Sequence, residues 1–151
     1  MKQKQSIGRL ISSINTSICV YIDLELKEYN IGCGQISYLR ALSDQDGVSQ
    51  ETLTAQFGVN KATTARAISK LVKKGYVTRK RDEADNRAYK LYLTKKGKKM
   101  EPKIKSVLQQ LTEALSIDLA DDERASVIHL LEKMSQNILT ENKKVRAASI
   151  D

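Results

Sequence analysis

Residues 49–81, SQETLTAQFGVNKATTARAISKLVKKGYVTRKR, decide the fold. We predict a short helix over residues 50–57, because its apolar side chains share one face. Gly58 follows, and a glycine past a helix end adopts the left-handed conformation that closes the helix. Asn60 can then cap a second helix by accepting a backbone N–H. The pattern therefore indicates two helices joined by a tight turn.

The second helix, predicted over residues 61–74 and ended by Gly75, has two unlike faces. Its inward face is formed by Thr64, Ala67, Ile68 and Leu71. Its outward side chains are small, polar or cationic, namely Ala62, Ala65, Arg66, Ser69, Lys70 and Lys73. A tight pair of helices, the second with a short-side-chain basic face, is typical of the helix-turn-helix.

A β-hairpin is predicted next. Residues 76–81 (YVTRKR) and 88–94 (AYKLYLT) have strand patterns, and the polar DEADNR between them is rich in turn-forming residues. Val48 is expected to pair with this sheet, and Thr94 to cap the following helix. A hairpin after a helix-turn-helix predicts a winged helix.

The hairpin region resembles the wing motif of MarR-type transcriptional regulators, G-[LY]-[VI]-x-R-x-x-D-x-x-D-x-R-x-x-x-[LV]-x-L-T-x-x-G. The matching residues are Gly75, Tyr76, Val77, Arg79, Asp82, Asp85, Arg87, Leu91, Leu93, Thr94 and Gly97. The resemblance implies a homodimer that binds double-stranded DNA, more often as a repressor, and that is released by a phenolic or other lipophilic aromatic ligand.

Helices are expected on both sides of this centre. We predict helices over residues 6–29, 34–43, 95–117 and 122–142, with a loose tail after the last. Pro102 lies inside the third span and should kink that helix or start it afresh, because proline lacks the backbone N–H. The fold class is therefore mainly α with a small β-wing.

The apolar stripes of the first helix and of the last two exceed what one small winged lobe can cover. A second copy of the chain is the simplest way to bury them. We assign residues 1–30 and 103–151 to a helical dimerisation region and residues 31–102 to the DNA-binding lobe. A monomer whose terminal helices fold back on its own core is the alternative.

The charge distribution favours nucleic acid as the partner. The chain has 151 residues and a net charge of +8. Residues 61–105 contain sixteen lysines and arginines and four acidic residues, a net of +12, so the remainder sums to −4. A basic centre between mildly acidic ends is typical of a DNA-binding protein, although a solvated basic face without a partner would look similar.

DNA contacts are predicted on two elements. The N-terminal residues of a recognition helix enter the major groove, so Ala62, Thr63, Ala65 and Arg66 are the predicted base readers, and Lys61, Ser69 and Lys70 the predicted phosphate contacts. On the wing we expect contacts from Lys80, Arg81 and Arg87. Arg87 matches the family arginine that reaches the minor groove, and Asp85 the aspartate that holds this arginine or the loop in shape.

Effector and redox functions have weaker signals. A pocket for an aromatic effector could be lined by Ile14, Ile18, Tyr21 and Tyr38, although each is also a plausible core residue. The family's peroxide sensors carry a cysteine near the start of the first helix, where this chain has none. We therefore expect Cys19 and Cys33 to be reduced, inert thiols, with a cysteine-based redox sensor as an alternative.

Other classes of protein are disfavoured. No signal peptide or membrane span is predicted, so we expect a cytoplasmic protein. The single histidine, His129, has no cysteine near it in the sequence at the spacing typical of metal ligands, so no metal or cofactor is expected. No catalytic constellation is present, and we predict that the chain is not an enzyme. A winged-helix module that docks protein or RNA is the alternative from another functional class.

Overall fold

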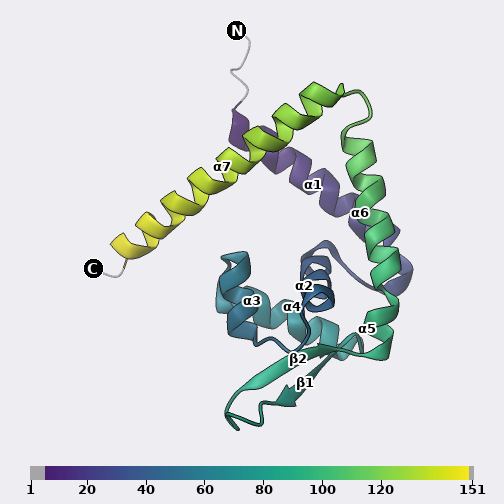
Figure 1. The fold of residues 1–151 in the computed structure, drawn as a ribbon, viewed down its shortest axis with the longest axis vertical. Coiled ribbons are helices and arrows are strands. Elements are labelled where there is room, and N and C mark those ends of the chain that lie inside the picture. Colours follow the sequence, from purple (N-terminus) through teal and green to yellow (C-terminus); the bar gives the residue numbers. More distant parts are fainter. Residues whose placement is uncertain (1–5, 150–151) are drawn as a thin grey trace. The chain divides into compact units, whose positions relative to one another are not determined.

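The computed structural model describes residues 6–149, and the chain divides into two compact units, residues 1–111 and 112–151. The outermost ends of the predicted dimerisation region, residues 1–5 and 150–151, lie outside the described residues. The chain is mostly helical with one two-stranded sheet (Figure 1), which confirms the predicted fold class.

The first unit begins with α1 (Ile7–Glu25) and the 3-10 helix η1 (Lys27–Tyr29). The sequence predicted a single helix to Tyr29, but α1 ends earlier and Asn30 adopts the left-handed conformation with φ of 55°. The turn lets α2 (Cys33–Asp44) fold back toward α1. The α1–α2 connection is thus tighter than the apolar periodicity indicated.

The helix-turn-helix follows as predicted. It consists of α3 (Gln50–Phe57) and α4 (Lys61–Lys73). Gly58 ends α3 with φ of 63°, a conformation that costs a residue with a Cβ more than it costs glycine. The predicted inward face of α4, Thr64 with Ala67, Ile68 and Leu71, is buried.

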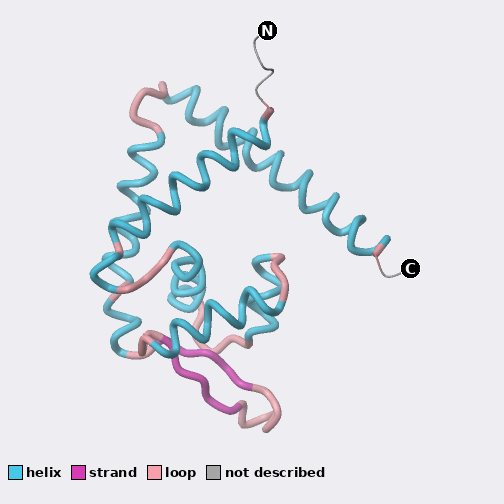
Figure 2. The backbone as a smooth tube through the Cα atoms, turned by 180° about the vertical axis from the view of Figure 1, so that it is seen from behind, coloured by secondary structure: helices cyan, strands magenta, loops and turns pink. Residues whose placement is uncertain are grey.

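The wing is the antiparallel hairpin of β1 (Val77–Arg81) and β2 (Tyr89–Leu93), with Val77 opposite Leu93 and Arg81 opposite Tyr89. Its strands and loop extend from the helices of the first unit (Figure 2). Val48 forms a bridge to Leu91, as expected, and the backbone N–H of Leu91 donates to its carbonyl at 2.8 Å.

Thr94 caps α5 (Lys95–Lys99), as predicted, and its hydroxyl accepts from the N–H of Gly97 at 3.1 Å. A Cβ on Gly97 would overlap the backbone oxygen of Tyr76, so the close approach of α5 to the wing requires glycine. The helix restarts as α6 (Glu101–Leu115), with Pro102 in its first turn, where the missing N–H disrupts least.

One core holds the first unit together. Its least exposed side chains come from the end of α1 and from α2, α3, α4 and β2. They include Leu26, Leu42, Leu53, Ile68, Leu71 and Leu91. Tyr38 is also buried, and its hydroxyl lies 3.3 Å from that of Thr64. This pairing satisfies two polar groups inside an otherwise apolar core.

The second unit contains α7 (Asp121–Ala148), whose N-terminus is closed by the Glu123 carboxylate accepting from the N–H of Ala120 at 2.9 Å. The predicted end near residue 142 and the loose tail are wrong, because α7 continues to Ala148. The added residues are good helix formers without glycine or proline, and Lys144 pairs with Glu141 one turn earlier.

Candidate nucleic-acid interface

The outer face of α4 presents the predicted contact residues together. Lys61, Ala62, Arg66, Ser69 and Lys70 are exposed, and Thr63 and Ala65 are half-buried. The buried face of the same helix anchors it in the core. Short side chains near the N-terminal end leave room for another molecule to approach the helix backbone.

The N-terminus of α4 is fixed by Asn60. The side-chain oxygen of Asn60 accepts from the backbone N–H of Thr63 at 2.8 Å and from its hydroxyl at 2.9 Å. The hydroxyl proton of Thr63 is thus directed toward the cap, while its oxygen can still accept a hydrogen bond. Sequence reasoning identified the cap but missed this second bond.

Arg79 joins the wing to both helices of the helix-turn-helix. Its Nη2 atom donates to the side-chain oxygen of Gln50 at 3.2 Å and to the hydroxyl of Ser69 at 3.3 Å. One guanidinium on β1 therefore holds the start of α3 and the middle of α4. Arg79 belongs to the motif, but no local pattern indicates its partners, because they lie 29 and 10 residues away in the sequence.

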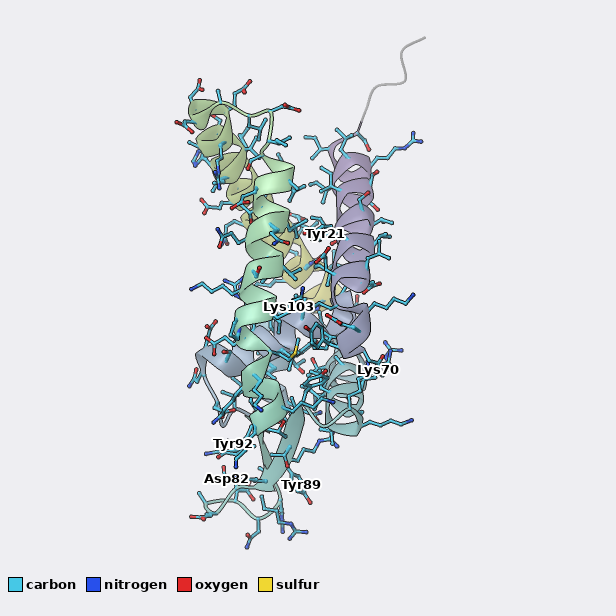
Figure 3. All side chains as sticks on the ribbon, turned by 90° about the vertical axis from the view of Figure 1, so that its right-hand side faces the viewer. Tyr21, Lys70, Asp82, Tyr89, Tyr92 and Lys103 are labelled. Atoms are coloured by element: carbon cyan, nitrogen blue, oxygen red, sulfur yellow. A yellow bond between two sulfur atoms is a disulfide. The ribbon has the colours of Figure 1, made fainter. Side chains whose placement is uncertain are left out.

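Two basic side chains of the wing lie over tyrosine rings. The Lys80 ammonium is 5.0 Å from the ring centre of Tyr92, and the Arg81 guanidinium is 5.9 Å from that of Tyr89. Figure 3 shows both tyrosines on the wing. Cation–π contacts of this kind favour particular orientations of long basic side chains.

The wing loop is shaped by two aspartates. Asp82 accepts from the N–H of Ala84 at 3.0 Å and pairs with Lys90 at 3.5 Å. Asp85 accepts from the backbone N–H of Arg87, also at 3.0 Å. We expect the Asp85 carboxylate to hold either the Arg87 side chain or the loop in shape. In the structure it accepts its hydrogen bond from the Arg87 backbone, so the contact is one within the loop.

Positive charge on these two elements is largely unpaired. Within residues 6–149, the exposed cations of the α4 face and wing make no salt bridge with a carboxylate, and these are Lys61, Arg66, Lys70, Lys73, Arg79, Lys80, Arg81 and Arg87. Such a surface raises the local concentration of anions and favours a polyanion as partner.

The predicted effector residues lie in different surroundings. Ile14 is exposed on α1, and Ile18 and Tyr21 are half-buried, with the Tyr21 hydroxyl donating to Gln110 of α6 at 3.4 Å. Tyr38 lies in the core, where its ring meets that of Phe57 edge to face, with ring centres 4.9 Å apart. The α1 residues line one face, and Tyr38 belongs to the lobe interior.

The prediction of two reduced thiols is wrong for this structure, in which Cys19 and Cys33 form a disulfide. Their Cα atoms are 5.1 Å apart, within the range that a disulfide spans. The turn through η1 brings the end of α1 beside the start of α2. The position of the family's peroxide-sensing cysteine, on which the prediction rests, contains no information on that geometry.

Membrane spans and metal clusters can both be assessed over residues 6–149. Each helix within residues 6–149 is too short or too polar to span a lipid bilayer. These residues also contain no cluster of three or more histidine, cysteine or acidic side chains suited to a metal ion.

Comparisons with known proteins agree with this geometry. The model of the MarR family matches residues 33–89. An uncharacterized HTH-type transcriptional regulator, YybA of Bacillus subtilis, is 30% identical over 132 residues, covering 87% of this chain and 83% of that protein.

Solved structures are similar as well. A MarR transcriptional regulator from Methanosarcina mazei Go1 is 42% identical with a TM-score of 0.81, over 89% of this chain and 96% of that one. A putative MarR family regulator from Listeria monocytogenes, solved with a 26mer DNA, is 26% identical with a TM-score of 0.82, over 91% of each chain.

Proposed function

Because the chain belongs to the MarR family of winged helix-turn-helix, DNA-binding transcriptional regulators, we propose that it acts in the cytoplasm as a homodimeric repressor. Its operator would be pseudo-palindromic, since a two-fold dimer presents two identical lobes to DNA. The observation that supports this most is the unpaired cationic face of α4 beside an ordered basic wing.

In this proposal α4 occupies the major groove with its N-terminal half against the bases. Arg66 donates two hydrogen bonds to the O6 and N7 atoms of a guanine, the commonest specific contact of arginine. The oxygen of Thr63 accepts from a base amino group, and the methyl groups of Ala62 and Ala65 can contact a thymine methyl. Phosphates are contacted by Lys61, Ser69 and Lys70.

The wing contacts the adjacent minor groove. Arg87, at the exposed end of the loop that Asp85 shapes, inserts where the groove is narrow and its negative potential is strongest. Lys80 and Arg81, lying over their tyrosine rings, contact the backbone on either side. These contacts add affinity and a preference for A/T-rich flanks.

Exposed apolar side chains support the dimer. On α1 they are Ile7, Leu10, Ile11, Ile14, Val20 and Leu24, and on α7 they are Val127, Ile128, Leu130, Leu131, Ile138, Leu139 and Val145. Apolar stripes of this extent on two long helices are unusual for a monomer and typical of an interface. We propose that residues 1–30 and 103–151 of two copies cover one another.

Regulation by a small lipophilic aromatic ligand belongs to the same proposal. Ile14, Ile18 and Tyr21 form an apolar, partly exposed face on α1, and the Tyr21 hydroxyl offers a polar contact. A ligand held there in the dimer would change the spacing of the two lobes and release DNA. Tyr38 lies in the lobe interior against Phe57 and Thr64, so we leave it out of this ligand face.

A second candidate mode of regulation is oxidation, favoured by the Cys19–Cys33 disulfide. It ties α1, in the proposed dimerisation region, to α2, in the DNA-binding lobe. Forming or breaking it would alter how firmly these two elements are connected. DNA affinity of the oxidised and reduced protein, with Cys33→Ser as the unresponsive control, separates this mode from ligand-induced release.

Selection of bound sequences from a random duplex pool tests the proposed function. Two inverted half-sites with centres about 10 base pairs or a multiple of that apart are expected. Equal affinity for selected and random duplexes would instead favour a winged-helix module that docks protein or RNA.

A further inference from the structure

A basic pocket of about 510 Å³ lies at the C-terminal end of α4. Its lining comes from the α1–α2 connection, α2, the end of α4 and α5, and consists of Tyr29, Asn30, Gln35, Lys70, Lys73, Lys74 and Lys96. Figure 3 labels Lys70 of this set. The volume is within the range of small-molecule sites, but four of the seven lining residues are lysines, whereas such sites are usually mostly apolar.

The positive charge of this pocket is not neutralised by the chain. No carboxylate lines it, and within residues 6–149 none of its four lysines forms an ion pair. The Glu28 carboxylate accepts a hydrogen bond from the hydroxyl of the lining residue Tyr29 and raises the pKa of that tyrosine, but Glu28 itself lines a separate pocket with Lys103. Like charges held together are unfavourable unless a counter-charge binds between them. The negative end of the α4 dipole offsets part of this repulsion, also for Lys96, whose ammonium donates to the Lys74 carbonyl at the end of α4, but it amounts to only about half an elementary charge against four ammonium groups.

Two of the lysines are held in place by neutral oxygens. The Lys74 ammonium donates to the side-chain oxygen of Gln35 at 3.1 Å, and the Lys96 ammonium donates to the carbonyl of Lys74 at 2.8 Å. Lys96 also lies over the ring of Tyr76, 4.3 Å from its centre. Burial, and secondly the charge of Lys70, lower the pKa of Lys74. The ammonium groups are therefore oriented before any ligand arrives.

Gln35 adds its side-chain amide to the hydrogen-bond donors of this pocket. It is 7% exposed, and its side-chain oxygen already accepts from Lys74 and from the backbone N–H of Gly32. The amide group of Asn30 is exposed on the left-handed turn beside it. Ammonium groups have no acceptor capacity, so the polar side chains offer mainly hydrogen-bond donors to a ligand. That combination suits an oxyanion.

We propose that this pocket binds a small, multiply charged phosphate anion, of the pyrophosphate or nucleoside-polyphosphate class. A single carboxylate would neutralise one of the four ammonium groups, whereas linked phosphates place several charges within one pocket volume. Lysine acts as a point-charge partner for phosphate and needs no planar, bidentate geometry. Tyr29 at the rim could contact the organic part of a nucleotide.

DNA is a different occupant, and the position of the pocket argues against it. The proposed base readers occupy the first two turns of α4, whereas Lys73 and Lys74 lie at its other end, roughly 10–18 Å away along the helix at 1.5 Å per residue. Lys70 belongs to both sets, so a bound anion would compete with a DNA phosphate for one ammonium group. A concave site built by three helices and a turn fits a small ion better than the convex surface of a duplex.

Calorimetric titration of the full-length protein with sodium pyrophosphate, without DNA and at constant ionic strength, tests the proposal. We expect one pyrophosphate per chain, and a Kd raised about tenfold or more by Lys74→Gln and by Lys96→Gln, each of which removes one charged donor. Lys99→Gln is the matched control, because Lys99 is exposed on the same helix as Lys96 and does not line the pocket. Thermal melting confirms that each variant folds.

Each outcome decides for or against the site. No binding below about 1 mM, or equal weakening by the control, overturns it. A third outcome is that the wild type does not bind pyrophosphate and the two pocket variants lose affinity for random duplex DNA. This result would identify a DNA-backbone site and would also overturn the phosphate site. Because the titration contains no DNA, its result is independent of the proposed regulatory function.

Discussion

Reduction of the Cys19–Cys33 disulfide should lower the thermal stability of the protein measurably. The bond closes a loop with a sequence separation of 14 residues. In the chain-entropy model a loop of this length restricts the unfolded state by about 3 kcal/mol. For a chain of 151 residues, 1 kcal/mol corresponds to about 2–4 °C in Tm. The expected decrease in Tm is therefore about 6–12 °C.

The assay is thermal unfolding by circular dichroism, with and without a phosphine reductant, at one protein concentration because dimers melt in a concentration-dependent way. Thiol titration before each scan verifies the redox state. Reduction keeps both sulfur atoms in place, so it isolates the cross-link from packing, and Cys33→Ser should melt alike in both buffers. A wild-type protein with no free thiols whose Tm does not change on complete reduction would refute the reasoning.

Other substitutions test the surface and the core. Arg66→Ala should cost about 1–3 kcal/mol in operator affinity and relax the sequence preference at one base per half-site. Arg40→Ala, which changes an exposed arginine on α2, should leave both unchanged. If the sequence selected by Arg66→Ala is the same as that of the wild type, Arg66 is not a base reader. Asp85→Ala should weaken DNA binding by loosening the loop at the Arg87 N–H, although it removes a negative charge. Glu83→Ala, an equal charge loss in the same loop, should tighten binding or leave it unchanged, so tighter binding by both variants contradicts a structural role for Asp85. Thr64→Val should destabilise the fold by about 1–3 kcal/mol by leaving the buried Tyr38 hydroxyl without its partner, and the double variant with Tyr38→Phe should recover part of this in chemical denaturation.

Local signals explain why the winged helix was predictable. The glycine after α3, the asparagine cap of α4 and the polar loop of the wing each act within a few residues of where they stand. The buried face of α4 followed from helical periodicity alone, since i, i+3 and i+4 positions share a side. The pairing of Val48 with the wing sheet is also confirmed, and the structure identifies Leu91 as its partner.

The errors arose where distant residues decide the structure. The disulfide depends on the turn through η1, which a helical pattern continuing past Glu25 concealed. The lysine pocket combines residues from Tyr29 to Lys96, and no spacing in the sequence relates them. The extension of α7 is a different kind of error, because helix-forming residues near a chain end fit both a continued helix and a loose tail.

Arg79 shows how one such distant contact connects the parts that were predicted separately. A wing joined to α4 only through the chain could tilt, and each orientation would place Arg87 differently relative to Arg66. The bonds from Arg79 to Gln50 and Ser69 restrict that tilt before DNA arrives, so less ordering entropy is lost on binding. Arginine suits this position because its five N–H donors form a fixed fork, and the bonds to two neutral oxygens leave further donors free. The charge of Arg79 therefore remains uncompensated by these partners, and it adds to the positive potential of the surface while its geometry holds the wing against the helix.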